Sequence, residues 1–203
     1  MSIGFPRLKP GGVSGIIGKE NALARRIEGT LAMNDLLELM KGRYSVRSFR
    51  PDPVPEETVQ KIVEAGLSAP TAHNNQPQKI LVVQSEEGLQ KLRKCTECHY
   101  GAPLALIVCY DGALCWKRSY DGKRSGDVDA SIVAAHMMLE AEALGVGSTW
   151  VMYFIPDAVK AEFSLPKGVE PSAILVMGTP SEEAKPAPAH FANRNREEMV
   201  RYL

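Results

Sequence analysis

Three short runs of apolar residues stand out along the chain, separated by stretches with helical periodicity. The runs span residues 79–84, 104–110 and 173–178. Apolar runs of this length without alternation predict strands that are buried on both faces of a sheet. The sequence therefore predicts a central sheet whose two faces are covered.

Helices are predicted before and between these strands. Apolar residues recur at helical spacing in residues 34–42, where Asn34 is a suitable N-cap and Gly42 a suitable end. A second helix is predicted over residues 55–67, which begin with a proline followed by two acids. A short polar helix is predicted at 86–93.

Residues 127–145 carry the strongest helical pattern. One apolar stripe consists of Val128, Ile132, Ala135, Leu139 and Ala143. Further apolar residues, among them Met137 and Met138, lie elsewhere on the circumference. Such a helix must be covered on most sides, either by its own subunit or partly by a partner subunit. Both interpretations remain open from the pattern alone.

Composition narrows the class of protein. The chain has 203 residues, of which 44% are hydrophobic and 24% charged, and this suits one globular domain. Its 24 basic and 24 acidic residues leave no net charge, so we expect no nucleic-acid partner and no membrane partner. Because neither a bilayer-spanning run nor a leader pattern is visible, we expect a cytoplasmic location.

The first 32 residues differ in pattern from the rest. They contain Pro10-Gly11-Gly12 followed by a mixed stretch. We expect residues 1–32 to be an N-terminal extension or arm and residues 33–203 to form the domain. Since Met33 stands directly before the predicted helix cap, a native start at Met33 is an alternative.

Four cysteines cluster in the middle of the chain: Cys95, Cys98, Cys109 and Cys115. The string Cys95-Thr-Glu-Cys98-His99 matches a c-type haem attachment motif and also the spacing of a redox or zinc pair. Haem attachment requires export, and Cys109 falls in a predicted buried strand, where a small apolar thiol is expected. We therefore expect reduced cysteines and no metal, with a redox pair as the main alternative.

Residues Arg43-Tyr44-Ser45-Val46-Arg47 alternate arginine and serine. In an extended segment, alternate side chains point to the same side. Guanidinium forks beside a hydroxyl suit a phosphate, although the serine could instead cap its own turn. The segment predicts a ligand that carries a phosphate.

Four segments, taken in order, resemble the nitroreductase-like FMN-dependent flavoproteins. They are Arg43-x-Ser45-x-Arg47-x-Phe49, the loop Ala69-Pro70-Thr71-Ala72-x-Asn74-x-Gln76-Pro77, the helix from Asp127 with the turn 145–150 after it, and Arg194-x-Arg196 near the C-terminus. Each motif alone is weak evidence for membership of this family. Their common order over residues 33–203 makes the resemblance specific.

The resemblance implies an α+β fold with three layers (α-β-α), in which helices flank a central mixed, mainly antiparallel sheet. It implies a homodimer with FMN at the subunit interface and NADH or NADPH as electron donor. The implied activity is reduction of an electron-poor acceptor, a nitroaromatic or quinone, by ping-pong hydride transfer. Because the flavin carries this chemistry, no catalytic side chain is expected.

The resemblance also implies which residues contact the cofactor. Arg43, Arg47 and one of the two tail arginines would meet the phosphate, and Asn74 would contact the polar edge of the flavin ring. The full expected set is Arg43, Tyr44, Ser45, Arg47, Pro70, Thr71, Asn74, Gln76, Trp150, Val151, Met152, Arg194 and Arg196.

Two further features concern the substrate side of this expected site. Met152 and Tyr153 stand where better-known members of the resembled family carry glutamate and glycine, so main-chain rather than side-chain contacts are expected there. Trp116 and Tyr120 lie in the loop 111–126. We expect them to form a lid over the substrate, although they could instead fold back onto the core.

Fold alone does not fix function, and two alternatives remain. One is a different flavin reaction on the same scaffold: reductive dehalogenation, ring dehydrogenation or flavin–oxygen chemistry. The other is a cysteine-cluster module, metal-binding or redox-active, without flavin.

Overall fold

A computed structural model describes residues 35–203 of the chain, and their side chains from residue 36 onward. Four strands form one sheet in the order β1-β2-β4-β3. The strands are β1 (Gln78–Val83), β2 (Leu104–Asp111), β3 (Gly147–Val151) and β4 (Val169–Gly178), and all neighbouring pairs are antiparallel. A parallel contact occurs as an isolated bridge between Ser45 and Ser148.

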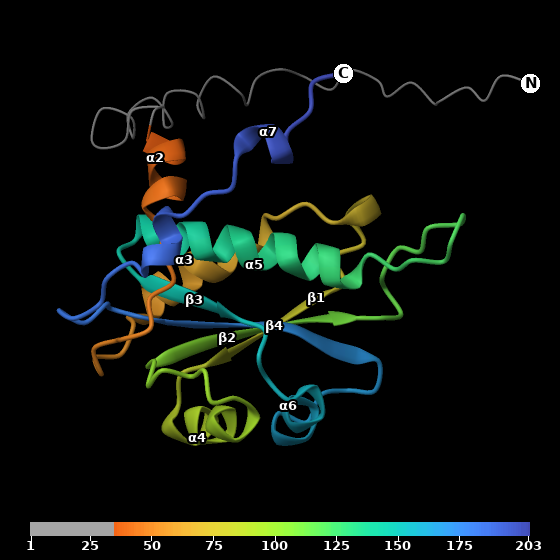
Figure 1. Cartoon of the computed structure of the whole chain (residues 1–203). Helices are drawn as coiled ribbons and strands as arrows, with labels where there is room; N and C mark the ends of the chain where they lie inside the picture. The colour runs from red at the N-terminus through yellow and green to blue at the C-terminus, as the bar shows by residue number, and fades with distance from the viewer. Residues whose placement is uncertain (1–34) are drawn as a thin grey trace, which may run out of the picture. The chain divides into compact units, whose positions relative to one another are not determined.

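Helices cover both faces of this sheet. The α-helices of the described residues are α2 (Asp35–Gly42), α3 (Glu56–Leu67), α4 (Glu86–Cys95), α5 (Gly126–Ala143), α6 (Pro156–Glu162) and α7 (Arg196–Met199). Figure 1 shows α3 and α5 on one face of the sheet and α4 and α6 on the other. The expected three-layer α+β fold is confirmed.

The central strands β2 and β4 are buried on both faces, as their apolar runs predict. In β2, Leu106 and Val108 belong to a core cluster shared with α3 and α5, whereas Ile107 and Cys109 belong to a second cluster shared with α4 and α6. All four side chains are fully buried. Alternation along a strand sends successive side chains to opposite faces, so continuous apolarity is what a double-sided core requires.

Two strand predictions were wrong in detail. The run that became β1 is not buried on both faces: β1 lies at an edge of the sheet, and Val82 is 48% exposed there. Most of the expected turn 145–150 instead belongs to the other edge strand, β3. Both Ser148 and Thr149 are buried there: the main-chain oxygen of Ser148 and the hydroxyl of Thr149 bond to Val46 of a neighbouring segment.

Helix α5 is packed against the sheet on one side only. Val133 and Met137 are fully buried, and Met137 lies so close to α3 that a Cβ on Gly66 would be 2.7 Å from its Cγ. The predicted stripe is not the buried side of the helix: Val128 and Ala135 are exposed, and Ile132 is half-buried at the margin of the core. A single chain therefore leaves an apolar face of α5 open.

Other predictions fall outside what the structure describes. These concern the N-terminal extension 1–32, the alternative start at Met33 and the cap at Asn34, and the division into extension and domain stays a prediction. Among the described residues, no helix is long and apolar enough to cross a membrane.

Candidate functional site

The segment that begins at Arg43 is bound to the edge strand β3. The main-chain nitrogen of Val46 donates to the oxygen of Ser148 at 3.0 Å, and the hydroxyl of Thr149 donates to the oxygen of Val46. The Thr149 bond takes the place of a main-chain hydrogen bond that a further strand beside β3 would make. Arg43, Ser45 and Arg47 are therefore carried on a fixed main chain, at the point where α5 ends and β3 begins.

Arg43 has an unsatisfied donor in this place. Its Nη1 is buried and has no hydrogen-bond partner among the described residues, and the same holds for the nearby hydroxyl of Ser148. Burial raises the pKa of the Glu142 carboxyl, and the charge of Arg43 partly offsets that rise. Buried polar groups are almost always hydrogen-bonded, so this donor is an exception among the described residues, and the phosphate contact expected of Arg43 stays a prediction.

Arg47 and Tyr44 have looser surroundings. Arg47 is exposed, and its Nη1 lies 3.4 Å from the oxygen of Ser45. The pKa of the Tyr100 hydroxyl is raised by its hydrogen bond with Cys98 and by burial. The neighbouring Arg47 lowers this pKa and so partly offsets the rise. The ring of Tyr44 meets His190 edge-on, with ring centroids 6.4 Å apart.

The second expected motif is a tightly wound loop before β1. His73, Asn74 and Gln76 all have positive φ angles, of 55°, 55° and 50°. Gln76 donates from its main-chain nitrogen to the hydroxyl of Thr71 and from Nε2 to Oδ1 of Asn74. Left-handed backbone at non-glycine residues is held only where its surroundings determine it, and it gathers at functional sites. The side chains of Pro70 and Asn74 are exposed at the surface of this loop.

A buried carboxylate that sequence reasoning missed supports this loop. Asp129, 1% exposed, accepts from the main-chain nitrogen of Ala72 at 2.9 Å and from the hydroxyl of Ser125 at 2.6 Å. The sequence motif pointed instead to Asp127, which is exposed and accepts from Ser172. One signal was available: Asp129 lies four residues before Val133, on the buried side of α5, where an acid requires partners.

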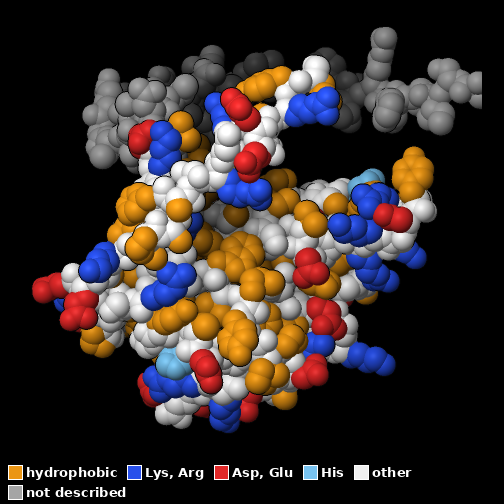
Figure 2. Space-filling model, viewed as in Figure 1, with side chains coloured by type: hydrophobic (Ala, Val, Ile, Leu, Met, Phe, Trp, Pro, Cys, Tyr) orange, Lys and Arg blue, Asp and Glu red, His pale blue; other side chains and the backbone are white. Residues whose placement is uncertain are grey.

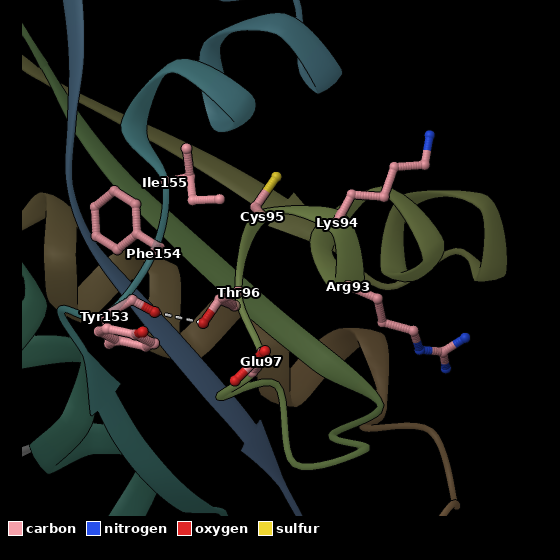
Figure 3. Close-up of a pocket in the computed structure, with 8 residues that line it drawn as sticks. All are labelled: Arg93, Lys94, Cys95, Thr96, Glu97, Tyr153, Phe154 and Ile155. Carbon is pink, nitrogen blue, oxygen red and sulfur yellow. Dashed lines mark hydrogen bonds between the residues drawn. The ribbon is translucent and has the colours of Figure 1, made fainter.

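The end of β3 presents the third expected segment. Trp150 is half-buried against the core and Val151 is buried, whereas Met152 is 66% and Tyr153 75% exposed. Tyr153 and the two residues after it line a cavity of about 380 Å³ together with the end of α4. Figure 3 shows these lining residues. There the hydroxyl of Thr96 donates to the main-chain oxygen of Tyr153 at 2.5 Å. The chain direction at the exposed end of β3 is thus set by α4.

The expected lid is a short hairpin between β2 and α5. Lys117 and Arg124 pair antiparallel, and the nitrogen of Ser125 donates to the oxygen of Trp116 at 3.0 Å. The Trp116 ring stacks on His73, with centroids 5.5 Å apart and planes 17° apart. Tyr120, near the tip, is 95% exposed. The lid role of Trp116 and Tyr120 stays a prediction, with Trp116 lying against the Asn74 loop.

The two tail arginines pair with other residues of the tail. Arg194 pairs with Glu198 at 3.2 Å, and Arg196 donates to the Tyr202 hydroxyl at 2.7 Å. Residues 191–203 are exposed throughout. A phosphate contact by either arginine stays a prediction.

Within one chain the first two motifs lie far apart. Arg43 lies beside Glu142 near the end of α5, whereas the Asn74 loop is tied to Asp129 in its first turn. These two acids are thirteen positions apart in the helix, which corresponds to about 20 Å along the axis. The motifs also lie at opposite edges of the sheet, since one borders β3 and the other leads into β1. A single subunit does not bring them together.

The cysteines have the surroundings of structural thiols. All four are free, Cys95 and Cys109 are buried, and burial raises the pKa of Cys109 to about 12. Over residues 35–203, no group of three or more His, Cys, Asp and Glu side chains is arranged to hold a metal ion. The buried Cys109 fits its predicted place in a core strand.

Comparison with known proteins identifies the class. The model of the nitroreductase family matches residues 40–100 and 99–179. A Clostridium difficile 630 nitroreductase family protein of known crystal structure is 43% identical, with a TM-score of 0.77 over 81% of this chain and 96% of that one. The chain belongs to the nitroreductase family.

Two curated relatives have more specific names. A Thermus thermophilus protein named NADH dehydrogenase is 30% identical over 79% of this chain and 94% of its own length. A Bacillus subtilis protein named FMN reductase (NAD(P)H) is 28% identical over 77% of this chain and 70% of its own. The resemblance inferred from the four motifs is therefore confirmed at the level of the family.

Proposed function

We propose that this protein is an FMN-dependent NAD(P)H oxidoreductase that reduces an electron-poor acceptor of the nitroaromatic or quinone type. The observation that carries the proposal is the buried, unpartnered Nη1 of Arg43, held on a fixed main chain beside β3 in a member of the nitroreductase family. A phosphate oxygen supplies the acceptor that this donor lacks.

The residues present fit FMN by their chemistry. Arg43, Ser45 and Arg47 would hold the phosphate, and Asn74 would offer both a donor and an acceptor to the polar edge of the ring. The main chain of Met152 would border the ring. When bound, FMN would supply hydride transfer from the nicotinamide to the acceptor. The protein would bind and orient the ring; no side chain is assigned as an acid or base, and water would supply the proton that the reduced acceptor takes up.

A homodimer would complete this site. The motifs at the two ends of α5 come together if α5 of one subunit packs antiparallel to α5 of the other, because the start of each helix then lies beside the end of its partner. The open apolar face of α5, with Val128 and Ile132, offers the contact surface. Hydrophobic side chains gather over the middle of the face shown in Figure 2, around the region of α5 and β3.

Exposed apolar residues after β3 also support a contact between two subunits. Met152, Tyr153 and Ile155 are each at least 60% exposed in the single chain. Contiguous exposed apolar surface marks interaction sites in soluble proteins. We therefore place FMN between the subunits, with Arg43 from one and Asn74 from the other. The cytoplasmic location stays a prediction from the sequence.

Cofactor binding and turnover test this function directly. The purified protein, reconstituted with FMN and freed of excess ligand, should retain about one FMN per chain, measured by visible absorbance. It should then oxidise NADH or NADPH with a panel of nitroaromatic and quinone acceptors. A protein that retains no FMN would overturn the proposal, and one that retains FMN but reduces no acceptor on the panel would overturn the assigned reaction.

A further inference from the structure

Asp129 is a buried ionisable group that the proposed reaction does not use. Each of its carboxylate oxygens accepts one hydrogen bond: Oδ1 from the nitrogen of Ala72 and Oδ2 from the hydroxyl of Ser125. These two donors belong to different segments. Ala72 opens the loop that carries Asn74, and Ser125 closes the hairpin that carries Trp116.

Two further contacts join the same pair of segments. The imidazole of His73 stacks on the ring of Trp116, and Nδ2 of Asn75 donates to the main-chain oxygen of Leu114 at 3.0 Å. The loop and the hairpin therefore meet at an aromatic stack, a side-chain hydrogen bond and a shared carboxylate. Asp129 is the most buried of these contacts and the one anchored in a long helix.

We propose that Asp129 is a positioning residue that joins the Asn74 loop and the Trp116 hairpin into one rigid element, so that the cofactor contact and the substrate lid are set together. This inference rests on the proposed function, which gives the loop and the hairpin their roles. The hairpin then does not open as an independent flap, because opening would break its bonds to the cofactor loop.

The position of Asp129 explains how one carboxylate can hold both segments. It lies in the first turn of α5, where the helix dipole favours negative charge. Its charge is shielded from water, so its hydrogen bonds are strong and the loss of either partner is costly. Three residues of the Asn74 loop have left-handed backbone, which needs such a fixed support.

Three variants separate the roles of the two bonds. Asp129→Ala removes both bonds, Ser125→Ala removes only the bond to the hairpin, and Asp129→Asn keeps an oxygen that can accept from Ala72. Ser172→Ala is the matched control, since it removes a 2.9 Å hydrogen bond to Asp127 in the same first turn of α5 without touching either segment.

The first readout is hydrogen–deuterium exchange of the flavin-free protein, which does not depend on the proposed function. In Asp129→Ala, exchange should rise at least tenfold in both residues 70–77 and residues 112–125. Ser172→Ala should leave both segments unchanged. If Asp129→Ala raises exchange in neither segment, or in one segment only, the proposed coupling is overturned.

The second readout uses the holoenzyme. Asp129→Ala should raise the FMN Kd and the acceptor KM at least tenfold each. Ser125→Ala should raise mainly the acceptor KM. Asp129→Asn should restore the FMN Kd to within about threefold of wild type. Wild-type Kd and KM in Asp129→Ala would overturn the positioning role. A wild-type protein that binds no FMN would instead overturn the proposed function, while the exchange result would still decide the coupling.

Discussion

The hydroxyl of Thr96 donates to the main-chain oxygen of Tyr153 (Figure 3). The same hydroxyl accepts from the nitrogen of Cys98 at 3.0 Å. Thr96 is 6% exposed and follows the last residue of α4. The nitrogen of Ile155 also donates to the oxygen of Cys95 at 2.9 Å. The end of α4 therefore holds the exposed end of β3, where the cofactor ring is proposed to lie.

Thr96→Val should destabilise the protein by about 1 to 3 kcal/mol, because the main-chain groups of Tyr153 and Cys98, which are partly buried, lose their partner while the side chain keeps its shape. Urea unfolding measures the change. Thr96→Ser keeps the hydroxyl and should stay within about 1 kcal/mol of wild type. Equal stability of the valine and serine variants would show that the hydroxyl does not hold β3.

Arg43→Ala should weaken FMN binding by roughly ten- to a hundredfold, because a hydrogen bond to a charged group contributes about 1.5 to 3 kcal/mol. Titration of the flavin-free protein, followed by flavin fluorescence, measures the Kd. Arg50→Ala is the control: Arg50 is exposed, pairs with Asp52 at 2.7 Å and is assigned no contact with the cofactor. An unchanged Kd for Arg43→Ala would remove this arginine from the site.

Gly147→Ala should destabilise the protein by about 1 to 3 kcal/mol, since overpacking forces neighbours to move. A Cβ on Gly147 would lie 2.7 Å from Cγ2 of Val46 and 2.9 Å from Cγ of Pro180. Gly42→Ala is the control, because no atom lies within 4 Å of the Cβ that it would add. If thermal unfolding finds the two variants equally stable, the segment of Val46 is not packed against β3 as described.

Glu142→Gln tests the electrostatics near Arg43. Burial raises the pKa of Glu142 above its ordinary value of 4.5. The stability contribution of the protonated carboxyl is therefore present below about pH 4.5 and is lost as the pH rises through the raised pKa. Glu142→Gln should be more stable than wild type at pH 7, with a difference that shrinks towards zero near pH 4.

Thermal unfolding at both pH values measures this difference, with Glu140→Gln on the same helix as the control. A glutamine variant less stable than wild type at pH 7 would mean that the attraction between Glu142 and Arg43 outweighs the cost of burial.

The layers of the fold could be predicted from the sequence, but not the edges of the sheet. Residues 104–110 and 173–178 are apolar throughout because both faces of β2 and β4 are covered. Strand β3 gives no such signal, since it begins with Gly147, whose lack of a side chain leaves room for Val46, and Ser148, whose main-chain oxygen accepts from Val46. Which strand lies at an edge depends on the order of pairing, and no local pattern contains that order.

The candidate site was predictable to a similar extent. The Arg43 segment and the Asn74 loop have local patterns that point to a ligand, and the left-handed backbone at Asn74 agrees with a specialised loop. Their separation along α5 and the support from Asp129 are tertiary relationships between residues 57 or more positions apart, so spacing in the sequence could not give them.

The central claim is that each FMN site uses Arg43 from one subunit and Asn74 from the other. Mixing Arg43→Ala and Asn74→Ala subunits under two different affinity tags gives heterodimers with one site that keeps both residues and one that has lost both. Equilibrium titration of the purified heterodimer with FMN should find one site of wild-type affinity per dimer. Two equally weakened sites and no tight one would contradict the claim.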